Sequence, residues 1–420
     1  MARSMVAGVA SPSAAFAREK AHRRGARRES RRNRLVALLV ATAGVAGLVG
    51  FDGAGSAANA ASPSLGALPP QAGVVKSFAF DTRNPAIVYA LTIGHSNGAL
   101  GSQVFKTTDG GADWRATPAT GGDWVGFEEA LAADPEHPGT LYVGTGSAVQ
   151  KTVDGGHNWR ASKRGLLLPP RPPSRLGWVT ALAVDPGRSN VIYAGSDRIS
   201  RSSDGGRSWK TVFPPHPSRY PPDHVSALAI AATRPETIYA IIGEFANPSP
   251  TPSIGRTSIY KSTDGGTTWQ AWTVIRESIA PTALAVDPRH PTNIYAAIGA
   301  DVLRTTNAGE TWQPIVDGLP WADTRGVCHC LSQGGVRALA VDPRGTGIVY
   351  AALTQGGVYK TSNGGDNWVR AVGDMPLQTY TIAVDPTRPT TIYASDVSEM
   401  DNVPRILRSN DGGRTWATAP

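Results

Sequence analysis

One short motif recurs seven times and places an acidic or amide side chain at a fixed position, as a repeated metal-binding or catalytic group would be placed. The clearest copy spans residues 261–269 and reads Lys-Ser-Thr-Asp-Gly-Gly-Thr-Thr-Trp. Two copies carry asparagine, which keeps the hydrogen-bond acceptor and loses the charge that metal ligation or acid–base chemistry needs. We therefore interpret the position as structural. Its occupants are Asp109, Asp154, Asp204, Asp264, Asn307, Asn363 and Asp411.

The chemistry of this motif, called the glycine box below, is that of a tight turn. Its carboxylate or amide oxygen can accept hydrogen bonds from backbone amides two or three residues further on, and the glycines supply the positive φ angles of a tight hairpin. A tryptophan stands three residues after the last glycine of each box. There it would begin a return strand and bury a large area against the next repeat. These tryptophans are Trp114, Trp159, Trp209, Trp269, Trp312, Trp368 and Trp416.

The boxes belong to a longer repeat of about fifty residues, a period typical of repeat architectures. A second phrase precedes each box and is clearest at 179–194, Val-Thr-Ala-Leu-Ala-Val-Asp-Pro-Gly-Arg-Ser-Asn-Val-Ile-Tyr-Ala. Each repeat therefore contains four short strands: the Ala-Leu-Ala-Val strand, the Ile-Tyr-Ala strand, the strand that enters the box and the strand that begins at tryptophan. The pattern predicts an all-β fold, a single seven-bladed β-propeller over residues 74–420 with four antiparallel strands per blade.

The alternation of strands predicts two unlike faces. The turn after the first strand and the box share one face, and both are regular; the irregular connections lie on the other face, where function tends to concentrate. We expect a ligand to bind there, although each aromatic residue could equally cover a blade junction. The predicted binding residues are Trp178, Arg219, Tyr220, His224, Glu244, Trp321 and Arg325.

The two cysteines form a Cys328-His329-Cys330 segment. In an exported chain we expect them to form a local disulfide, strained because one residue separates them; a pair of thiols is the alternative. A metal site would need further ligands, which are not close in sequence. We therefore expect no metal.

The net charge of +8 is a property of the N-terminal leader. Residues 1–34 hold ten Lys or Arg and two Glu, whereas residues 61–420 carry a net charge of only +1, too little to bind nucleic acid through phosphates. An apolar run at 35–51 and Ala58-Asn59-Ala60 follow, which predict an export signal over 1–60 with cleavage near Ala60. The Sec and twin-arginine routes both stay open. Residues 61–73 read as a linker.

The combined Ala-Val-Asp-Pro, Ile-Tyr-Ala and Lys-Ser-Thr-Asp-Gly-Gly pattern resembles the BNR or Asp-box repeat of sialidases, sortilin-type receptors and xyloglucanase-type glycoside hydrolases. The resemblance covers residues 74–420 and is closest to the last two groups. It implies the propeller fold and leaves function open, because the boxes lie in turns away from the usual propeller site.

Two functions from different classes follow. We favour an exported binding module for carbohydrate or protein, a monomer without cofactor whose membrane contact would be limited to an uncleaved N-terminal segment. The alternative is a glycoside hydrolase, and similarity to xyloglucanase-type enzymes then implies Asp197 and Asp396 as its carboxylates, although neither is followed by the Val-Gly-Gly of that family. The Arg-Ile-Pro motif of sialidases is absent from the sequence.

Overall fold

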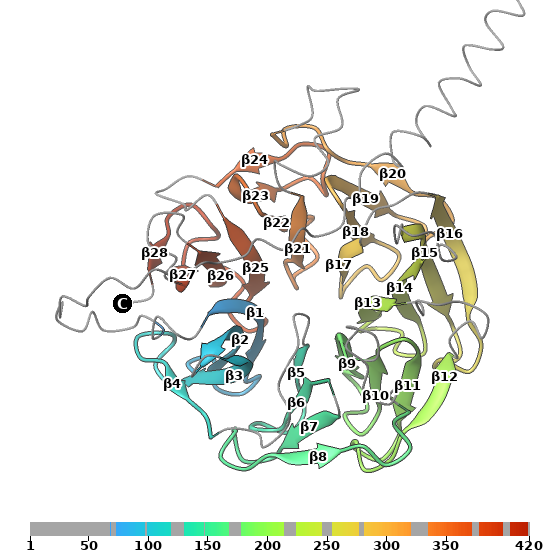
Figure 1. The fold of residues 1–420 in the computed structure, drawn as a ribbon. Helices are drawn as coiled ribbons and strands as arrows, with labels where there is room; N and C mark the ends of the chain where they lie inside the picture. Colours follow the sequence, from blue (N-terminus) through green and yellow to red (C-terminus); the bar gives the residue numbers. More distant parts are fainter. Residues whose placement is uncertain are drawn as a thin grey trace, which may run out of the picture.

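The computed structural model describes residues 68, 73–96, 99–118, 130–146, 148–167, 178–213, 224–245, 254–276, 281–320, 335–371, 378–397 and 404–418. These residues form seven four-stranded antiparallel sheets arranged radially in a ring (Figure 1). The prediction of a seven-bladed propeller with four strands per blade is confirmed. Among the residues that the structure describes, none forms a helix long and apolar enough to cross a bilayer.

Each blade consists of four strands that are consecutive in sequence, ordered from the ring axis outward. Blades one to four are β1 (Val74–Phe80), β2 (Val88–Ser96), β3 (Ala99–Thr107), β4 (Arg115–Ala116); β5 (Leu131–Ala133), β6 (Leu141–Gly144), β7 (Val149–Thr152), β8 (Arg160–Ser162); β9 (Ala181–Val184), β10 (Ile192–Gly195), β11 (Ile199–Ser202), β12 (Lys210–Phe213); and β13 (His224–Ile230), β14 (Ile238–Phe245), β15 (Ile254–Ser262), β16 (Gln270–Arg276). Blades five to seven are β17 (Pro281–Val286), β18 (Ile294–Ile298), β19 (Asp301–Thr305), β20 (Gln313–Pro314); β21 (Val336–Val341), β22 (Val349–Leu353), β23 (Gly357–Thr361), β24 (Val369–Arg370); and β25 (Thr379–Val384), β26 (Ile392–Val397), β27 (Pro404–Ser409), β28 (Ala417–Thr418).

The hydrophobic core lies between blades, and each box tryptophan packs into the junction with the preceding blade. Trp368 of blade six, for example, clusters with Tyr295 and Ile315 of blade five, and its indole N–H donates to the Ile315 carbonyl at 2.8 Å. The degree of burial varies, because Trp368 is only 2% exposed whereas Trp269 is partly exposed. The periodic tryptophan therefore joins neighbouring blades.

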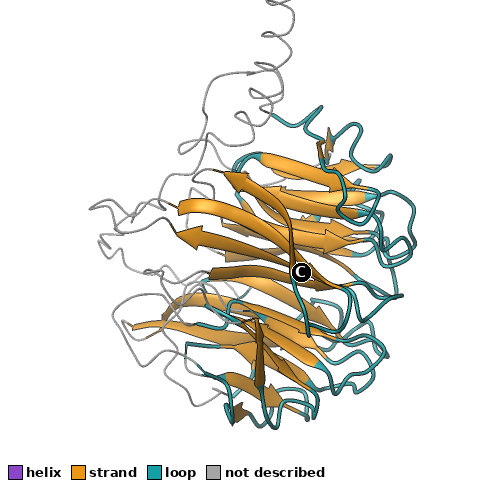
Figure 2. Cartoon of the chain, turned by 90° about the vertical axis from the view of Figure 1, so that its right-hand side faces the viewer, coloured by secondary structure: helices purple, strands orange, loops and turns teal. Residues whose placement is uncertain are grey.

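The regular face is built from two turns per blade that bond to each other. In every blade the amide of the first glycine of the box, or of Ala308 in blade five, donates to a carbonyl of the turn between the first and second strands at 2.8–3.0 Å. The turns gather on one side of the ring, at the right in Figure 2. These bonds fix the ends of all four strands of a blade together.

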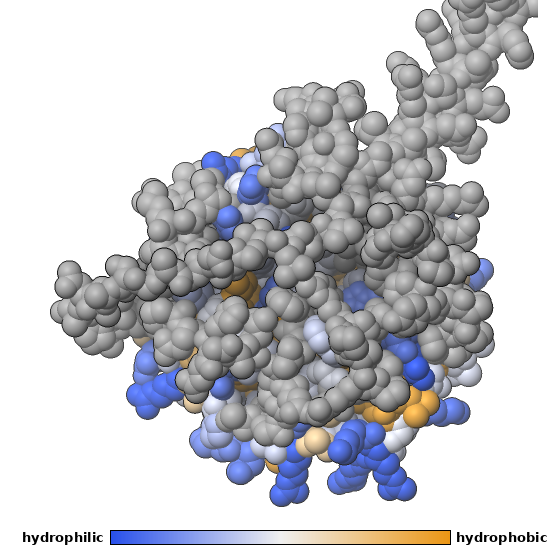
Figure 3. Space-filling model, viewed as in Figure 1, coloured by the Kyte–Doolittle hydropathy of each residue, from blue (hydrophilic) through white to orange (hydrophobic). Residues whose placement is uncertain are grey.

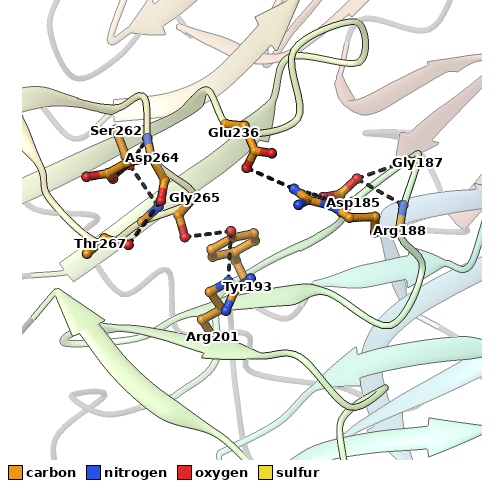
Figure 4. Close-up of polar contacts among 11 residues, drawn as sticks. Asp185, Gly187, Arg188, Tyr193, Arg201, Glu236, Ser262, Asp264, Gly265 and Thr267 are labelled. Carbon is orange, nitrogen blue, oxygen red and sulfur yellow. Dashed lines mark hydrogen bonds and ion pairs between the residues drawn. The ribbon is translucent and has the colours of Figure 1, made fainter.

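In blades two, three, six and seven, a buried tyrosine of the second strand donates to a box carbonyl of the next blade. The hydroxyl of Tyr193 in blade three donates to the Gly265 carbonyl of blade four at 2.9 Å, and Arg201 donates to the same hydroxyl at 3.2 Å (Figure 4). On the surface beside them, Arg188 pairs with Glu236 at 3.0 Å. The positions equivalent to Tyr193 are Tyr89, Tyr142, Tyr239, Tyr295, Tyr350 and Tyr393, all at most 2% exposed.

The ring closes through side chains and not through a shared strand. Tyr393 of blade seven donates to the Gly110 carbonyl of blade one at 2.9 Å, and its ring lies 6.0 Å from Phe78 and 5.7 Å from Phe80. Leu68, which falls in the predicted linker, is 1% exposed and belongs to the same cluster. The closing contact therefore repeats the tyrosine-to-glycine bond between blades three and four, with added aromatic packing.

Candidate functional site

The glycine boxes have the geometry of turns and not of reactive groups. In all seven, an oxygen of the Asp or Asn side chain accepts the backbone amide four residues further on, at 2.9–3.1 Å. The predicted bond to the amide three residues on is present at Asp109 and Asp411, and the bond four residues on, which was not predicted, is present in every box. Asn307 and Asn363 keep this bond without a charge. The structural interpretation of the boxes agrees with this geometry.

Hydrogen bonds also settle the charge state of the boxes that keep aspartate. The hydroxyl and amide of Thr268, with the hydroxyl of Ser262, lower the pKa of Asp264 to about 2. A carboxylate that is so fully engaged as an acceptor is a poor general base or acid near neutral pH. The regular face therefore offers repeated anionic turns and little varied chemistry.

The opposite end of the ring axis, where the inner strands begin, carries a different kind of repetition. In five of the seven inner strands the register slips by one residue at the same position, which marks a β-bulge. Bulges re-aim side chains and are common beside functional sites. The bulged residues, called the bulge set below, are Lys76, Ser226, Thr282, Arg337 and Tyr380.

Three members of the bulge set meet on neighbouring inner strands of blades six, seven and one. The Lys76 ammonium lies 5.6 Å and the Arg337 guanidinium 6.0 Å from the centre of the Tyr380 ring. On blades three and five, Thr180 and Thr282 instead donate to carbonyls of the next blade, at 2.7 and 2.5 Å. The chemistry around the axis is therefore asymmetric, with the cations on one side.

The structure places only some of the predicted binding residues. Trp178, partly exposed, lies three residues before β9 of blade three, and His224 is the first residue of the inner strand β13 of blade four. Glu244 lies in β14 opposite Arg256, without a described side chain. Trp178 and His224 thus lie at the beginnings of neighbouring blades. The residues that lie outside the described part of the chain are Arg219, Tyr220, Trp321, Arg325, Cys328 and Cys330.

Asp197 and Asp396 lie in blades three and seven, on different sides of the ring (Figure 1). Asp197 is held in a two-point ion pair with Arg198, at 2.9 and 2.8 Å, and also accepts from the Ser196 hydroxyl at 3.0 Å. Asp396 is 1% exposed, between Thr379 and Arg405 in the sheet register. Both carboxyl groups are thus engaged or buried.

A further carboxyl group, Asp301, was not among the predicted site residues. It begins β19, directly after the Gly299-Ala300 turn on the irregular face of blade five. Burial raises its pKa to about 6, and raised pKa values of this kind are frequent at catalytic acids. The sequence gives no direct signal for this shift, because it arises from desolvation by the folded neighbours.

Within the described ranges, no three His, Cys, Asp or Glu side chains gather in a way that could hold a metal ion. In the space-filling view of Figure 3, hydrophilic side chains of described residues gather at the lower rim of the ring.

Comparison with known proteins gives two curated relatives, both xyloglucanases. The chain is 28% identical over 173 residues to a xyloglucanase of Paenibacillus sp., covering 33% of this chain and 16% of the relative. It is 23% identical over 215 residues to a probable oligoxyloglucan-reducing end-specific xyloglucanase of Neosartorya fischeri, covering 48% of this chain and 24% of the relative. The chain thus matches less than a quarter of the length of each. No family model matches the sequence.

Among solved structures, the fold is similar to that of glycoside hydrolases and of one other propeller. The GH74 xyloglucanase of Xanthomonas campestris has a TM-score of 0.54 and 17% sequence identity, and the match covers 83% of this chain and 60% of that enzyme. The GH74 enzyme of Niastella koreensis has a TM-score of 0.51 and 18% identity, and the match covers 82% of this chain and 58% of that enzyme. YCF48 of Cyanidioschyzon merolae has a TM-score of 0.51 and 17% identity, and the match covers 82% of this chain and 97% of YCF48. At these identities the similarity shows the fold: a seven-bladed propeller with xyloglucanase neighbours.

Proposed function

We propose that this protein is an exported, glycoside-hydrolase-like propeller that acts on a polysaccharide at the irregular face. The observation that carries the proposal is that both curated relatives are xyloglucanases. The propellers of two GH74 enzymes support it through the fold. The chain spans 58–60% of the length of those two solved enzymes, so the activity of the whole relatives comes to this chain only as a proposal.

The irregular face is the proposed location because its side chains differ from blade to blade. Trp178 is a partly exposed indole there, and aromatic rings present both an apolar surface and a polar edge to a ligand. The bulge set adds cationic, hydroxyl and phenol groups around the axis. We include Arg219, Tyr220, His224, Glu244, Trp321 and Arg325 in this proposal as predicted binding residues.

For hydrolysis we propose Asp301 as the general acid. A glycosidase needs one carboxyl group that is protonated near neutral pH and a second that is ionised. Asp301, with its pKa raised to about 6, suits the first role. Asp197 is the candidate for the second role, because both of its carboxyl oxygens accept from Arg198. Asp396 is the less suitable candidate, because it is 1% exposed.

A binding module without hydrolysis is the second candidate. It is favoured by the engagement of Asp197, whose oxygens already accept from Arg198 and Ser196 and are therefore less available to a water molecule or a sugar. The ligand could then be a glycan or a protein segment at the same face.

One experiment separates these functions. The purified full chain is incubated with xyloglucan and other β-glucans, and reducing-end release is measured beside retention in affinity electrophoresis. We expect Asp301→Asn to abolish release and keep retention, and Trp178→Ala and Trp321→Ala to weaken retention in a folded protein. Asp204→Asn and Asp264→Asn are the matched controls on the regular face and should leave both readouts unchanged. Retention without release supports the binding module. Loss of both release and retention in folded box variants would show that the site lies on the regular face.

Export is tested separately, by N-terminal sequencing of secreted protein, which should begin at or near Ala61. Full-length protein found solely in the cytosol would contradict the export signal.

A further inference from the structure

Three bulged residues from consecutive inner strands form a cationic group beside an aromatic ring. Lys76, Tyr380 and Arg337 come from β1, β25 and β21, and both cations lie within about 6 Å of the Tyr380 ring. Since each sits at the same bulge position of its strand, the three share one level along the axis. The propeller fold does not need charged or aromatic residues at this position, because blades three to five have Thr180, Ser226 and Thr282 there.

Arg337 is the member best prepared to bind a ligand. Its side chain is exposed, its Nε donates to the Thr354 hydroxyl at 2.8 Å, and that hydroxyl donates to the Gly335 carbonyl at 3.2 Å. Among the described residues no carboxylate pairs with this guanidinium, whose remaining N–H groups form a planar fork. Thr354 and Tyr380 thus fix the arginine without neutralising it, which reduces the entropy lost on binding.

Of the described acidic groups of this face, none is paired with Arg337. Asp396 of blade seven is 1% exposed, and Asp197 of blade three is paired with Arg198. Asp301 of blade five is a third acidic group of this face, and burial raises its pKa to about 6. Glu129, at the equivalent position of blade two, lies outside the described residues.

We infer that this group binds the carboxylate of an acidic sugar, so that the preferred polysaccharide contains uronic acid residues. A guanidinium fork matches a carboxylate at two points, and such charge-assisted pairs are stronger than neutral hydrogen bonds. The inference rests on the proposed function for its choice of a sugar over other carboxylates. It departs from the relatives, whose printed substrate is a xyloglucan.

The test is calorimetric titration of the full chain with four probes: an oligogalacturonide, the same oligosaccharide with its carboxyl groups reduced to alcohols, a xyloglucan oligosaccharide and a short acidic peptide. We expect the oligogalacturonide to bind most tightly and to lose about tenfold or more in affinity on carboxyl reduction. Its affinity should also fall as salt is raised.

Variants of blade six assign the effect to a residue. Arg337→Gln should cost about tenfold or more for the oligogalacturonide and little for its reduced form, and Arg337→Lys should recover part of the loss because it keeps the charge without the fork. Arg370, an exposed arginine on the outer strand β24 of the same blade, provides the control. Arg370→Gln should leave the affinity for every probe unchanged. Thermal unfolding confirms that each variant is folded.

The outcomes distinguish this inference from the proposed function. Tight binding of the xyloglucan oligosaccharide with no preference for carboxylate overturns the inference and keeps the proposed function. Tightest binding of the acidic peptide overturns the sugar as the source of the carboxylate. Failure of every oligosaccharide to bind overturns both. An oligogalacturonide affinity that is equal in the wild type and in Arg337→Gln overturns the assignment to this site.

Discussion

The hydroxyl of Tyr393 donates a 2.9 Å hydrogen bond to the carbonyl of Gly110, which lies 283 positions earlier in the chain. Tyr193 and Gly265 make the same bond, also at 2.9 Å, between blades three and four. The contact that closes the ring is therefore one instance of a repeated inter-blade contact.

Tyr393→Phe should lower the free energy of unfolding by about 0.5–1.5 kcal/mol, because it leaves the Gly110 carbonyl without this donor. Tyr239→Phe is the control: its hydroxyl is buried and has no hydrogen-bond partner, so its removal should be neutral or stabilising. Equilibrium unfolding in urea measures both. Equal changes in the two variants would show that the Tyr393–Gly110 bond adds no measurable stability.

Ala308→Gly should stabilise the protein by about 0.5–1 kcal/mol. Ala308 has φ of 59° in the box of blade five, where the other boxes have glycine, and it is the one non-glycine residue with positive φ in the described part of the chain. L-residues pay for this conformation, which glycine adopts freely. Ala112→Gly, in the box of blade one, is the control and should not stabilise. A lower denaturation midpoint for Ala308→Gly would contradict the strain argument.

Trp368→Ala should destabilise by about 3–5 kcal/mol, since the indole is 2% exposed and its N–H is bonded to Ile315. The same change at Trp269, which is partly exposed and bonds to the Gly266 carbonyl of its own box at 3.1 Å, should cost clearly less. Denaturant unfolding of the two variants gives the comparison, and a larger loss at Trp269 would refute it.

Asp264→Asn should leave stability at pH 7 nearly unchanged, as Asn307 and Asn363 occupy the same position. Because the folded pKa of about 2 lies below the ordinary value of 3.8, the charged carboxylate stabilises the fold above about pH 4, and this contribution disappears as pH falls toward 2. The variant should therefore lose less stability than the wild type between pH 4 and 2. Identical acid limbs in thermal unfolding would show that Asp264 is not held this way.

Asp301 should have the opposite effect on stability. Its folded pKa of about 6 lies above 3.8, so the protonated form stabilises the fold at low pH, and stability falls as pH rises from about 4 to 6 and then stays level. Asp301→Asn should remove this fall, a gain of about 1–3 kcal/mol over the wild type at pH 7 relative to pH 4. Parallel pH profiles of the two proteins would contradict the shift.

The fold followed from the sequence because its determinants are local. Box glycines, Asp-Pro turns and alternating strands each depend on neighbouring residues, and together they predicted seven blades. The bond from Asp264 to the amide four residues on was missed by one residue, since turn width depends on how the box meets the adjoining turn.

The site was less predictable because it depends on register and burial. The bulges that present Arg337 and Tyr380 arise from pairing between strands, and the raised pKa of Asp301 arises from desolvation. One signal was available and was not used: Arg198 directly follows Asp197 in sequence, and adjacent opposite charges at a short turn are well placed to pair.

The contiguity of the blades has a consequence for how such a gene can change. Because every hydrogen-bonded ladder lies within one uninterrupted segment, duplicating or deleting one repeat adds or removes a whole blade without breaking a sheet. New neighbours could meet through the same tyrosine-to-glycine bond that joins residues 393 and 110 and recurs in three other blades. The number of blades can therefore change by one repeat at a time. An insertion or deletion that falls within a repeat would instead break a sheet.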